Sequence, residues 1–513
     1  MAENGATAQI PANPAYFSLV SETLTGSICH VIKVNRVIAR LSETSAPIDL
    51  PTIVWVNILD YLDLNNRYHV SVTCSRLNEA FNHPTLWRKM KLFVLGNNEN
   101  YGFYNQVVIP TKSINLVKHF GKYFQHLTFV ISGHLDQDFG NWNDLVEEVS
   151  KECRLETLTL YAGVLTSIRH FAGNRSCSRN LKPLVNIVKN AFRLKNLNIV
   201  SWPMFPRNLE NLDENIFEAA MLNPKLKDLE HMSLFWSNTN VWTERQPILL
   251  SPRETADFVG HFSNLKHLAL RSPMMNEQLL EVLSSKQRQT LKRLQILVNY
   301  IPEDPDFAIP EISDRVWERF CLKNVGVEVE LTVMSRVPLV EFSNLLKPSC
   351  PVSVTKFMAY SRCDENVVQY VTDKYKNTLK CFESFGEDTA FENDLVSMVE
   401  KSPNLLQLIY RGRISCENVE RLAALRSNSW MTFDFLRENI YVNNTEDQYD
   451  EDQVIARGPD GKYVLVAMLR FHQREQMERE NDVRKQEMIK TVSKSVGYKW
   501  IPTPKKIQQV AQN

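Results

Sequence analysis

Apolar residues recur along the middle of the chain in one spacing: an apolar residue, two others, a second apolar residue, one other, and a third. Clear copies are Leu194-Leu197-Ile199, Leu265-Leu268-Leu270 and Leu291-Leu294-Ile296. The second and third positions are two residues apart, which is the spacing at which strand side chains point to the same face. Each copy therefore predicts a short strand that buries one face and turns the intervening residues outward.

The same spacing occurs from about residue 120 to residue 435, at intervals of roughly 25 to 39 residues. Further copies are Phe124-Leu127-Phe129, Leu155-Leu158-Leu160, Leu229-Met232-Leu234, Leu322-Val325-Val327, Val354-Phe357-Ala359, Leu379-Phe382, Leu405-Leu408-Tyr410 and Trp430-Phe433-Phe435. Segments upstream of many copies have apolar residues three and four apart, which predicts helices. These segments are 144–153, 184–192, 276–286, 367–376, 394–402 and 417–426.

A helix followed by a short strand, repeated about eleven times, predicts an α/β solenoid with a parallel sheet, since each unit exposes an apolar face that its neighbours cover. The repeats resemble divergent leucine-rich repeats, and the resemblance implies a curved array. That family usually has Asn three residues after the last of the three apolar strand positions. Here only Asn299 fits well. The alternative is another α/β fold with frequent leucine.

Residues 50–90 carry a different pattern. Leu50 and Pro51 precede a helically spaced apolar run, a second apolar set follows at 70–77, and Leu86-Trp87-Arg88 ends the segment. Roughly forty residues bury too little apolar surface to be stable alone. The segment therefore needs a partner or a larger body to pack against.

The order Leu-Pro, apolar helix, Val-x-Cys and Leu-Trp-Arg resembles an F-box. The resemblance implies a three-helix domain that docks the Skp-type adaptor of a cullin-RING ubiquitin ligase. The residues it implies at the adaptor are Leu50, Pro51, Val54, Ile58, Leu59, Leu62, Leu64, Val72, Cys74, Leu77, Leu86 and Trp87. The sequence departs from the family at Ile53, where an acidic residue is common, and at Leu77, where Trp is common. The alternative is an N-terminal helical cap of the solenoid, which would not explain the ordered Leu-Pro, Cys and Leu-Trp-Arg.

These patterns divide the chain into an N-terminal extension (1–46, partly disordered), an F-box (47–93), the repeats (94–440) and a C-terminal region (441–513). The C-terminal region begins with an acidic loop at 443–453. A helix over 462–490 follows, whose residues 464–469 could cap the last repeat. Residues 24–41 predict a short amphipathic helix, with a mitochondrial presequence as the alternative.

Outward positions on the predicted strands form the candidate surface for a protein substrate. The basic and histidine residues among them, which favour an acidic target, are His126, Lys195, Lys266, His267, Lys292, Arg293 and Arg411. The alternative for each residue is a solvated outward position. Trp202, Trp236 and Trp242 lie in predicted insertions, where they could anchor a partner or be packed.

Composition and missing motifs exclude several classes of function. Lys plus Arg (59) equals Asp plus Glu (59), so neither nucleic acid nor a membrane is expected as the main partner. The nine cysteines include no C-x-x-C pair, which fits a reducing compartment, cytoplasmic or nuclear. The sequence lacks a signal peptide, a long apolar span, and phosphate-loop, nucleophile-elbow and zinc-helix motifs.

We therefore expect no catalytic residues, no metal and no cofactor. The predicted function is substrate recognition in an SCF-type ubiquitin ligase, with cullin and RING subunits reached through the adaptor. The alternatives are a leucine-rich-repeat scaffold that acts outside a ligase, and an enzyme whose site carries no recognisable motif.

Overall fold

The computed structural model describes residues 50–62, 64–95, 110–132, 142–162, 177–201, 215–235, 250–302, 304, 307–358, 361, 365–386, 391–442 and 463–504. The chain forms two compact units. The first comprises Met1–Leu194 with Phe205–Asn223, and the second comprises Lys195–Met204 with Pro224–Asn513. The first unit contains both the predicted F-box and the first repeats, so the boundary between the units falls within the repeats.

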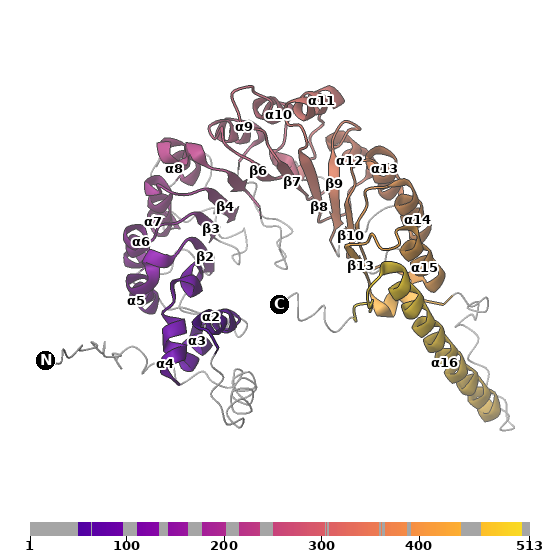
Figure 1. Ribbon diagram of the computed structural model, residues 1–513. Coiled ribbons are helices and arrows are strands. Elements are labelled where there is room, and N and C mark those ends of the chain that lie inside the picture. The colour runs from indigo at the N-terminus through magenta and orange to yellow at the C-terminus, as the bar shows by residue number, and fades with distance from the viewer. Residues whose placement is uncertain are drawn as a thin grey trace. The chain divides into compact units, whose positions relative to one another are not determined.

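The first unit begins with three helices and a 3-10 turn and continues as helix–strand repeats (Figure 1). Its elements are α2 (Thr52–Asp60), α3 (Leu64–Ser71), α4 (Ser75–Phe81), η2 (Pro84–Trp87), β1 (Lys89–Leu95), α5 (Pro110–Phe120), η3 (Gly121–Tyr123), β2 (His126–Ser132), α6 (Trp142–Glu152), β3 (Thr157–Ala162), α7 (Cys177–Asn190) and α8 (Ile216–Leu222). Strands β1, β2 and β3 pair in parallel in chain order.

The second unit continues the same alternation. Its first elements are β4 (Asn196–Ser201), η6 (Pro224–Asp228), β5 (His231–Ser233), α9 (Pro252–Gly260), β6 (His267–Arg271), η7 (Ser272–Met274), α10 (Glu277–Leu283), β7 (Arg293–Val298), α11 (Asp314–Lys323) and β8 (Glu328–Val333). Then come α12 (Leu339–Leu345), β9 (Val352–Phe357), α13 (Glu365–Tyr375), β10 (Cys381–Ser384), α14 (Glu392–Lys401), β11 (Gln407–Tyr410), β12 (Ile414–Ser415), α15 (Cys416–Leu425), β13 (Thr432–Phe435), η9 (Arg437–Asn439), β14 (Ile440–Tyr441) and α16 (Tyr463–Val496).

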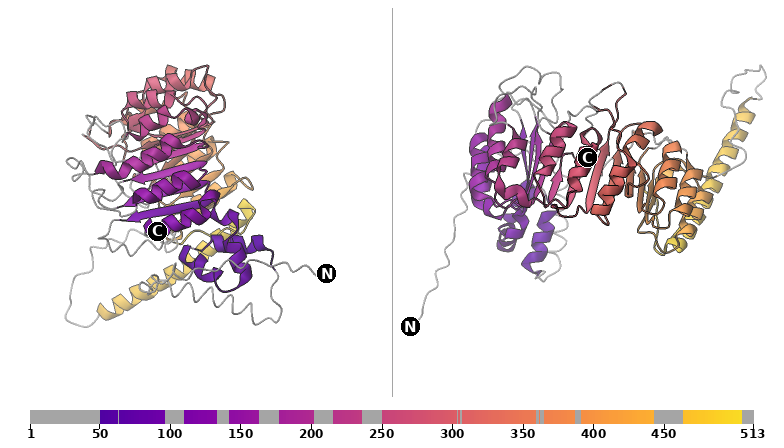
Figure 2. Two further views of the ribbon diagram at one scale, coloured as in Figure 1. Left: turned by 90° about the vertical axis from the view of Figure 1, so that its left-hand side faces the viewer. Right: turned by 90° about the horizontal axis from the view of Figure 1, so that it is seen from above.

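Strands β4 to β11 and β13 pair in parallel in chain order, and β12 pairs with β14 apart from them. Within each unit the helices cover one face of the strands (Figure 2). The register aligns Leu294 with Val329 and Ile296 with Leu331, and these side chains are buried. The intervening Gln295 points outward. The predicted α/β solenoid of helix–strand units is therefore confirmed.

Three strand predictions need correction. Strand β1 was not predicted, although Met90 and Leu92 are buried in it. The strand predicted at 322–327 is wrong. Leu322 lies at the end of α11 and is 72% exposed, and Val325 lies in the following turn and is 79% exposed. In β9 the buried positions are Val352, Thr355 and Phe357, two residues earlier than predicted.

Polar side chains join consecutive repeats through the carboxyl ends of the helices, where carbonyl groups lack partners within the helix. Asn223 donates to the carbonyl oxygens of Val188 and Ala191. Arg288 donates to those of Val259, Gly260 and Phe262. Asn324 and Arg426 make equivalent bonds to Leu283 and Val399. Asn299, which occupies the position where the leucine-rich-repeat family usually has Asn, is buried.

The C-terminal segment covers the last repeat of the second unit. Helix α16 packs on α15, burying Met488, Val492 and Val496. Arg484 forms two bonds of 2.8 Å to the Glu420 carboxylate on α15. The residues that cap the described repeat therefore lie after the predicted 464–469. The side chains of 464–469, the segments 24–41 and 443–453, and Trp202, Trp236 and Trp242 fall outside the described residues.

Candidate functional site

The N-terminal helices form a small core from apolar residues at helical spacing. Val56 and Leu59 of α2 are buried with Leu77 and Ala80 of α4 and with Leu86 of η2. Pro51 stands immediately before α2, where a missing backbone N–H costs no helical hydrogen bond. Leu59, Leu77 and Leu86 therefore hold the helices together and present no side chain to a partner.

Trp87 attaches this core to the first repeat. Its ring stacks on Phe120 of α5 at 4.0 Å between centroids and meets Phe81 edge-on at 5.0 Å. The indole N–H donates to the Phe81 carbonyl oxygen at 2.6 Å. Trp87 is fully buried by these contacts. The three helices are therefore fixed to a larger body, as their small size requires.

Arg67 holds the turn between α2 and α3. Its Nε donates to the Leu62 carbonyl oxygen at 2.8 Å, and its Nη2 bonds the Asp60 carboxylate at 3.1 Å. A third bond, from Nη1, reaches the Leu86 carbonyl oxygen at 3.4 Å. One guanidinium thus links the end of α2 to the end of the domain. Sequence reasoning did not single out Arg67, because no spacing rule marks a side chain that bonds backbone carbonyls.

Several large apolar side chains are exposed on the helices. Ile58 and Tyr61 are three residues apart at the end of α2 and are 43% and 92% exposed. Ile53 in α2 and Val72 after α3 are 49% and 59% exposed. Burying a large apolar side chain stabilises by about 1.5–3 kcal/mol, so a group of exposed ones indicates a docking surface. We call Ile53, Ile58, Tyr61 and Val72 the apolar docking face.

The twelve predicted adaptor residues divide between this face and the interior. Pro51, Ile58, Val72 and Cys74 are exposed, and Leu50, Val54, Leu62 and Leu64 are half-buried. Leu59, Leu77, Leu86 and Trp87 are buried. Tyr61 was missed, although its position three residues after Ile58 places it on the same helical face. Ile53, noted only as a departure from the family pattern, is also exposed.

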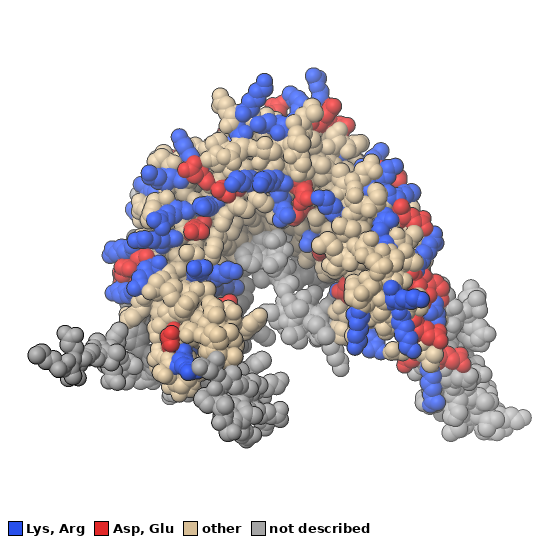
Figure 3. All heavy atoms as spheres, viewed as in Figure 1, with Lys and Arg blue, Asp and Glu red and all other residues tan. Residues whose placement is uncertain are grey.

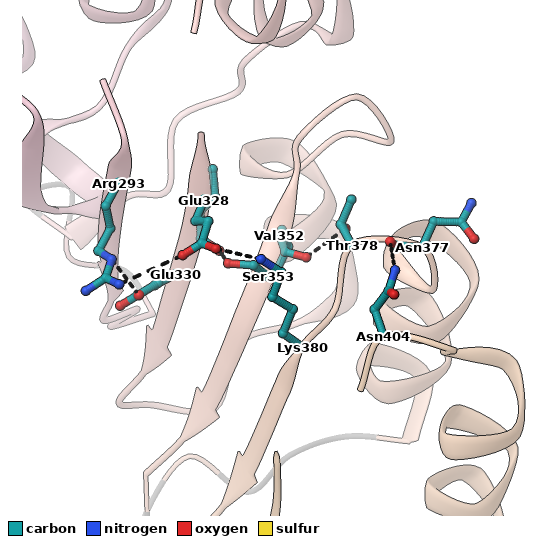
Figure 4. A network of polar contacts seen from close by, with 10 residues as sticks. Arg293, Glu328, Glu330, Val352, Ser353, Asn377, Thr378, Lys380 and Asn404 are labelled. Atoms are coloured by element: carbon teal, nitrogen blue, oxygen red, sulfur yellow. Dashed lines mark hydrogen bonds and ion pairs between the residues drawn. The ribbon is translucent and has the colours of Figure 1, made fainter. Parts of the chain in front are cut away.

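A second group of functional candidates lies at the start of the strands in the second unit. Lys266 forms an ion pair of 2.9 Å with Glu230, and its hydrogen bond to that carboxyl lowers the pKa of Glu230. Arg293 contacts Glu330 at 3.0 Å and Glu328 at 3.8 Å. Lys380 bonds Glu328 at 2.6 Å, so that Glu328 lies between two cations (Figure 4). Lys195 and Lys292 are exposed.

Two histidines lie beside these charges. The rings of His231 and His267 stack at 4.2 Å between centroids with an interplanar angle of 12°. Burial, followed by the neighbouring His231, Arg293, Lys292 and Lys266, lowers the pKa of His267 to about 4. Both histidine pKa values lie below the ordinary range, so the stacked rings are neutral near pH 7.

Two predicted substrate residues differ from this group. His126 lies in the first unit, where its Nδ1 is 2.9 Å from the Thr157 hydroxyl. Arg411 follows β11 and is only 6% exposed, because its Nη2 is paired with the Asp434 carboxylate at 2.5 Å. The prediction that Arg411 offers its side chain to a substrate is therefore corrected: the side chain leaves the sheet on the outward side but is covered.

Within the described residues, no three His, Cys, Asp or Glu side chains gather in a way that could hold a metal ion. No helix in the described part of the chain is both long and apolar enough to cross a membrane.

Residues 48–92 match the F-box-like family, which covers the three helices and η2. Together with the helix–strand repeats, this match and the similarity to two F-box/LRR-repeat proteins support an F-box/leucine-rich-repeat type of protein. It is 25% identical over 282 residues to F-box/LRR-repeat protein 21 of Bos taurus, covering 55% of this chain and 58% of that protein. It is 24% identical over 305 residues to the Mus musculus protein of the same name, covering 59% and 63%.

The matches thus span less than two thirds of the length of these curated relatives. Among solved structures, a chain in the crystal structure of the Rad7 and Elc1 complex in yeast is similar over 80% of this chain and 87% of its own length. Its sequence identity is 13% and the TM-score is 0.35.

Proposed function

We propose that this chain is the substrate-recognition subunit of an SCF-type ubiquitin ligase. In this proposal the apolar docking face of the F-box binds a Skp-type adaptor, and through it the chain joins the cullin and RING subunits. The observation that carries the proposal is the exposure of Ile58 and Tyr61 on an otherwise well-packed three-helix domain. The F-box match over residues 48–92 supports the same partner.

The energetics favour docking through this face. A few central apolar anchors carry most of the free energy of an interface, and each large side chain that becomes buried contributes about 1.5–3 kcal/mol. The contacts of Trp87 and Arg67 hold the helices in place before a partner arrives, which lowers the entropy lost on binding. The face is therefore a preformed site.

The repeats would act by holding a protein substrate close to the ubiquitin-conjugating partner of the ligase. Tethering raises the effective concentration of the substrate and needs no chemistry from this chain. The chain is accordingly proposed as a non-catalytic receptor that acts in the cytoplasm, the nucleus or both. A repeat scaffold outside any ligase is the second candidate, and it requires no adaptor.

Co-purification tests the first proposal against the second. The full chain is co-expressed with a Skp-type adaptor, and adaptor recovery is compared among wild type, Ile58→Asp and Leu322→Asp. Leu322 is the matched control, because it is an exposed leucine on a helix end far along the chain from the F-box. We expect at least a tenfold loss for Ile58→Asp, equivalent to about 1.4 kcal/mol, and none for Leu322→Asp. Equal recovery from all three proteins, or none from the wild type, would favour the scaffold.

A further inference from the structure

Within the part of the chain that the structure describes, no ion pair or hydrogen bond joins the side chains of two lysines at the strand starts of the second unit to a partner. Lys195 precedes β4 and Lys292 precedes β7, and both are exposed. The carboxylates of Glu230, Glu330 and Glu328 on neighbouring strands are each paired with another cation, namely Lys266, Arg293 and Lys380. We propose that the strand starts from β4 to β7 bind an acidic segment of a protein substrate through its Asp and Glu carboxylates. This inference rests on the proposed role of the repeats as the substrate receptor.

Backbone hydrogen bonds fix the order of the side chains in this row. The Lys195 carbonyl oxygen accepts the N–H groups of Glu230 and His231, at 2.9 and 3.0 Å. The Glu230 carbonyl oxygen accepts those of Lys266 and His267, and the Lys266 carbonyl oxygen accepts those of Lys292 and Arg293. Neighbouring strands are about 4.8 Å apart, so Lys195 and Lys292 are separated by roughly 14 Å. About four residues of an extended peptide span that distance.

The charges of the row are unbalanced toward positive. Lys266, Arg293 and Lys380 pair with the carboxylates of Glu230, Glu328 and Glu330, and Lys195 and Lys292 add two further positive charges. The excess is the two unpaired lysines. Both basic and acidic side chains occur on the face of the molecule that Figure 3 shows. The side chains at the strand starts (Lys195, Glu230, Lys266 and Lys292) can therefore select an acidic partner by the positions of its carboxylates as well as by its total charge.

The order of charges favours a peptide over a continuous polyanion. Glu230 lies between Lys195 and Lys266 in the row. A nucleic acid strand, which carries a negative charge at every unit, would bring like charge to Glu230. A peptide can place carboxylates opposite Lys195 and Lys292 and neutral residues opposite Glu230. Like-charge contacts of this kind exclude wrong partners.

The stacked histidine pair lies among the same charged side chains. His231 and His267 follow Glu230 and Lys266 in the chain and occupy the adjacent row beside Arg293. Burial and the surrounding cations hold the pKa of His267 at about 4, whereas Glu230 opposes this effect only at His231. A carboxylate that docks over the pair would raise the pKa of these rings, because an opposite charge favours the protonated form. Binding should then take up protons at acidic pH, between the free and the bound pKa values of the rings.

Fluorescence anisotropy on the full chain tests this proposal. The probe is a labelled peptide of alternating glutamate and glycine, compared with a glutamine–glycine peptide and a single-stranded DNA of similar length. The test variant is Lys195→Glu with Lys292→Glu. The control is Lys286→Glu with Lys374→Glu, which makes the same change in net charge at exposed positions outside the row. Circular dichroism confirms that each variant is folded.

We expect the dissociation constant of the glutamate peptide to rise at least tenfold in the test variant. In the control variant it should stay within about twofold of the wild-type value. Calorimetry in buffers of different ionisation enthalpy should show proton uptake, and His267→Gln should reduce it without abolishing binding. The proposal is overturned by equal binding to both double variants, by equal binding of the glutamine peptide, or by tighter binding of DNA. Adaptor recovery measured on the same variants decides the proposed function separately, because the F-box is unchanged in all of them.

Discussion

The indole N–H of Trp500 donates a hydrogen bond of 2.6 Å to the carbonyl oxygen of Phe433 on β13. The ring also packs against Phe433 and Phe435, at 5.9 and 6.3 Å between centroids. Thr503 then bridges to Leu436 in parallel. The segment after α16 thereby covers the apolar end of the second unit, as the terminal repeat of a solenoid requires.

Trp500→Ala should lower the free energy of unfolding by about 3–5 kcal/mol, the usual cost of deleting a fully buried Trp side chain. Urea unfolding followed by circular dichroism measures the change. Ile501→Ala is the control, because Ile501 is the next residue and is largely exposed. A similar loss for the two variants would mean that the segment does not cap the repeats.

Arg288→Met should cost at least about 2 kcal/mol, because it removes the charged donor that bonds the carbonyl oxygens of Val259, Gly260 and Phe262. Arg319→Met removes a guanidinium from an exposed ion pair with Glu281 and should cost about 0–1 kcal/mol. The two midpoints of thermal unfolding, measured side by side, test this difference. If the Arg319 variant were the less stable, the bonds between repeats would not have the importance inferred here.

Phe120→Ala should loosen the F-box from the first repeat, since it removes the ring that stacks on Trp87. An aromatic pair contributes about 0.5–1.5 kcal/mol beyond the area it buries. Amide hydrogen exchange in α2–α4 should therefore accelerate, while His119→Ala, at an exposed neighbouring position, leaves it unchanged. Unaltered exchange in the Phe120 variant would show that the F-box is held by other contacts.

The stability of the wild-type chain should fall between about pH 6.5 and pH 4 in part because of His267. Its folded-state pKa is lowered to about 4, whereas a histidine in an unfolded chain has a pKa of about 6.5. As the pH falls through this window the unfolded chain binds a proton that the folded chain refuses, so unfolding is favoured. The free energy of unfolding of the His267→Gln variant, measured by urea titration, should change less over that pH window. A parallel decline in both proteins would argue against a depressed pKa.

Local spacing was sufficient to predict most strands. The phrases at 265–270 and 291–296 became β6 and β7 with the expected residues buried, because the L-x-x-L-x-L spacing matches a strand packed on a helix. The phrase at 322–327 failed because residues three apart are also neighbours on a helix, and Leu322 belongs to α11. Spacing alone could not choose between the two.

The F-box motif by itself determined where this protein has an F-box-like domain, because Leu-Pro, Val-x-Cys and Leu-Trp-Arg are ordered features of a single short segment. Only the tertiary structure decided which of its residues face outward: Trp87 is enclosed by Phe81 and Phe120, whereas Tyr61 is left 92% exposed. It likewise buried Arg411 against Asp434 and left Lys292 unpaired. Burial and pairing depend on contacts between residues far apart in the chain, and a local pattern does not contain that information.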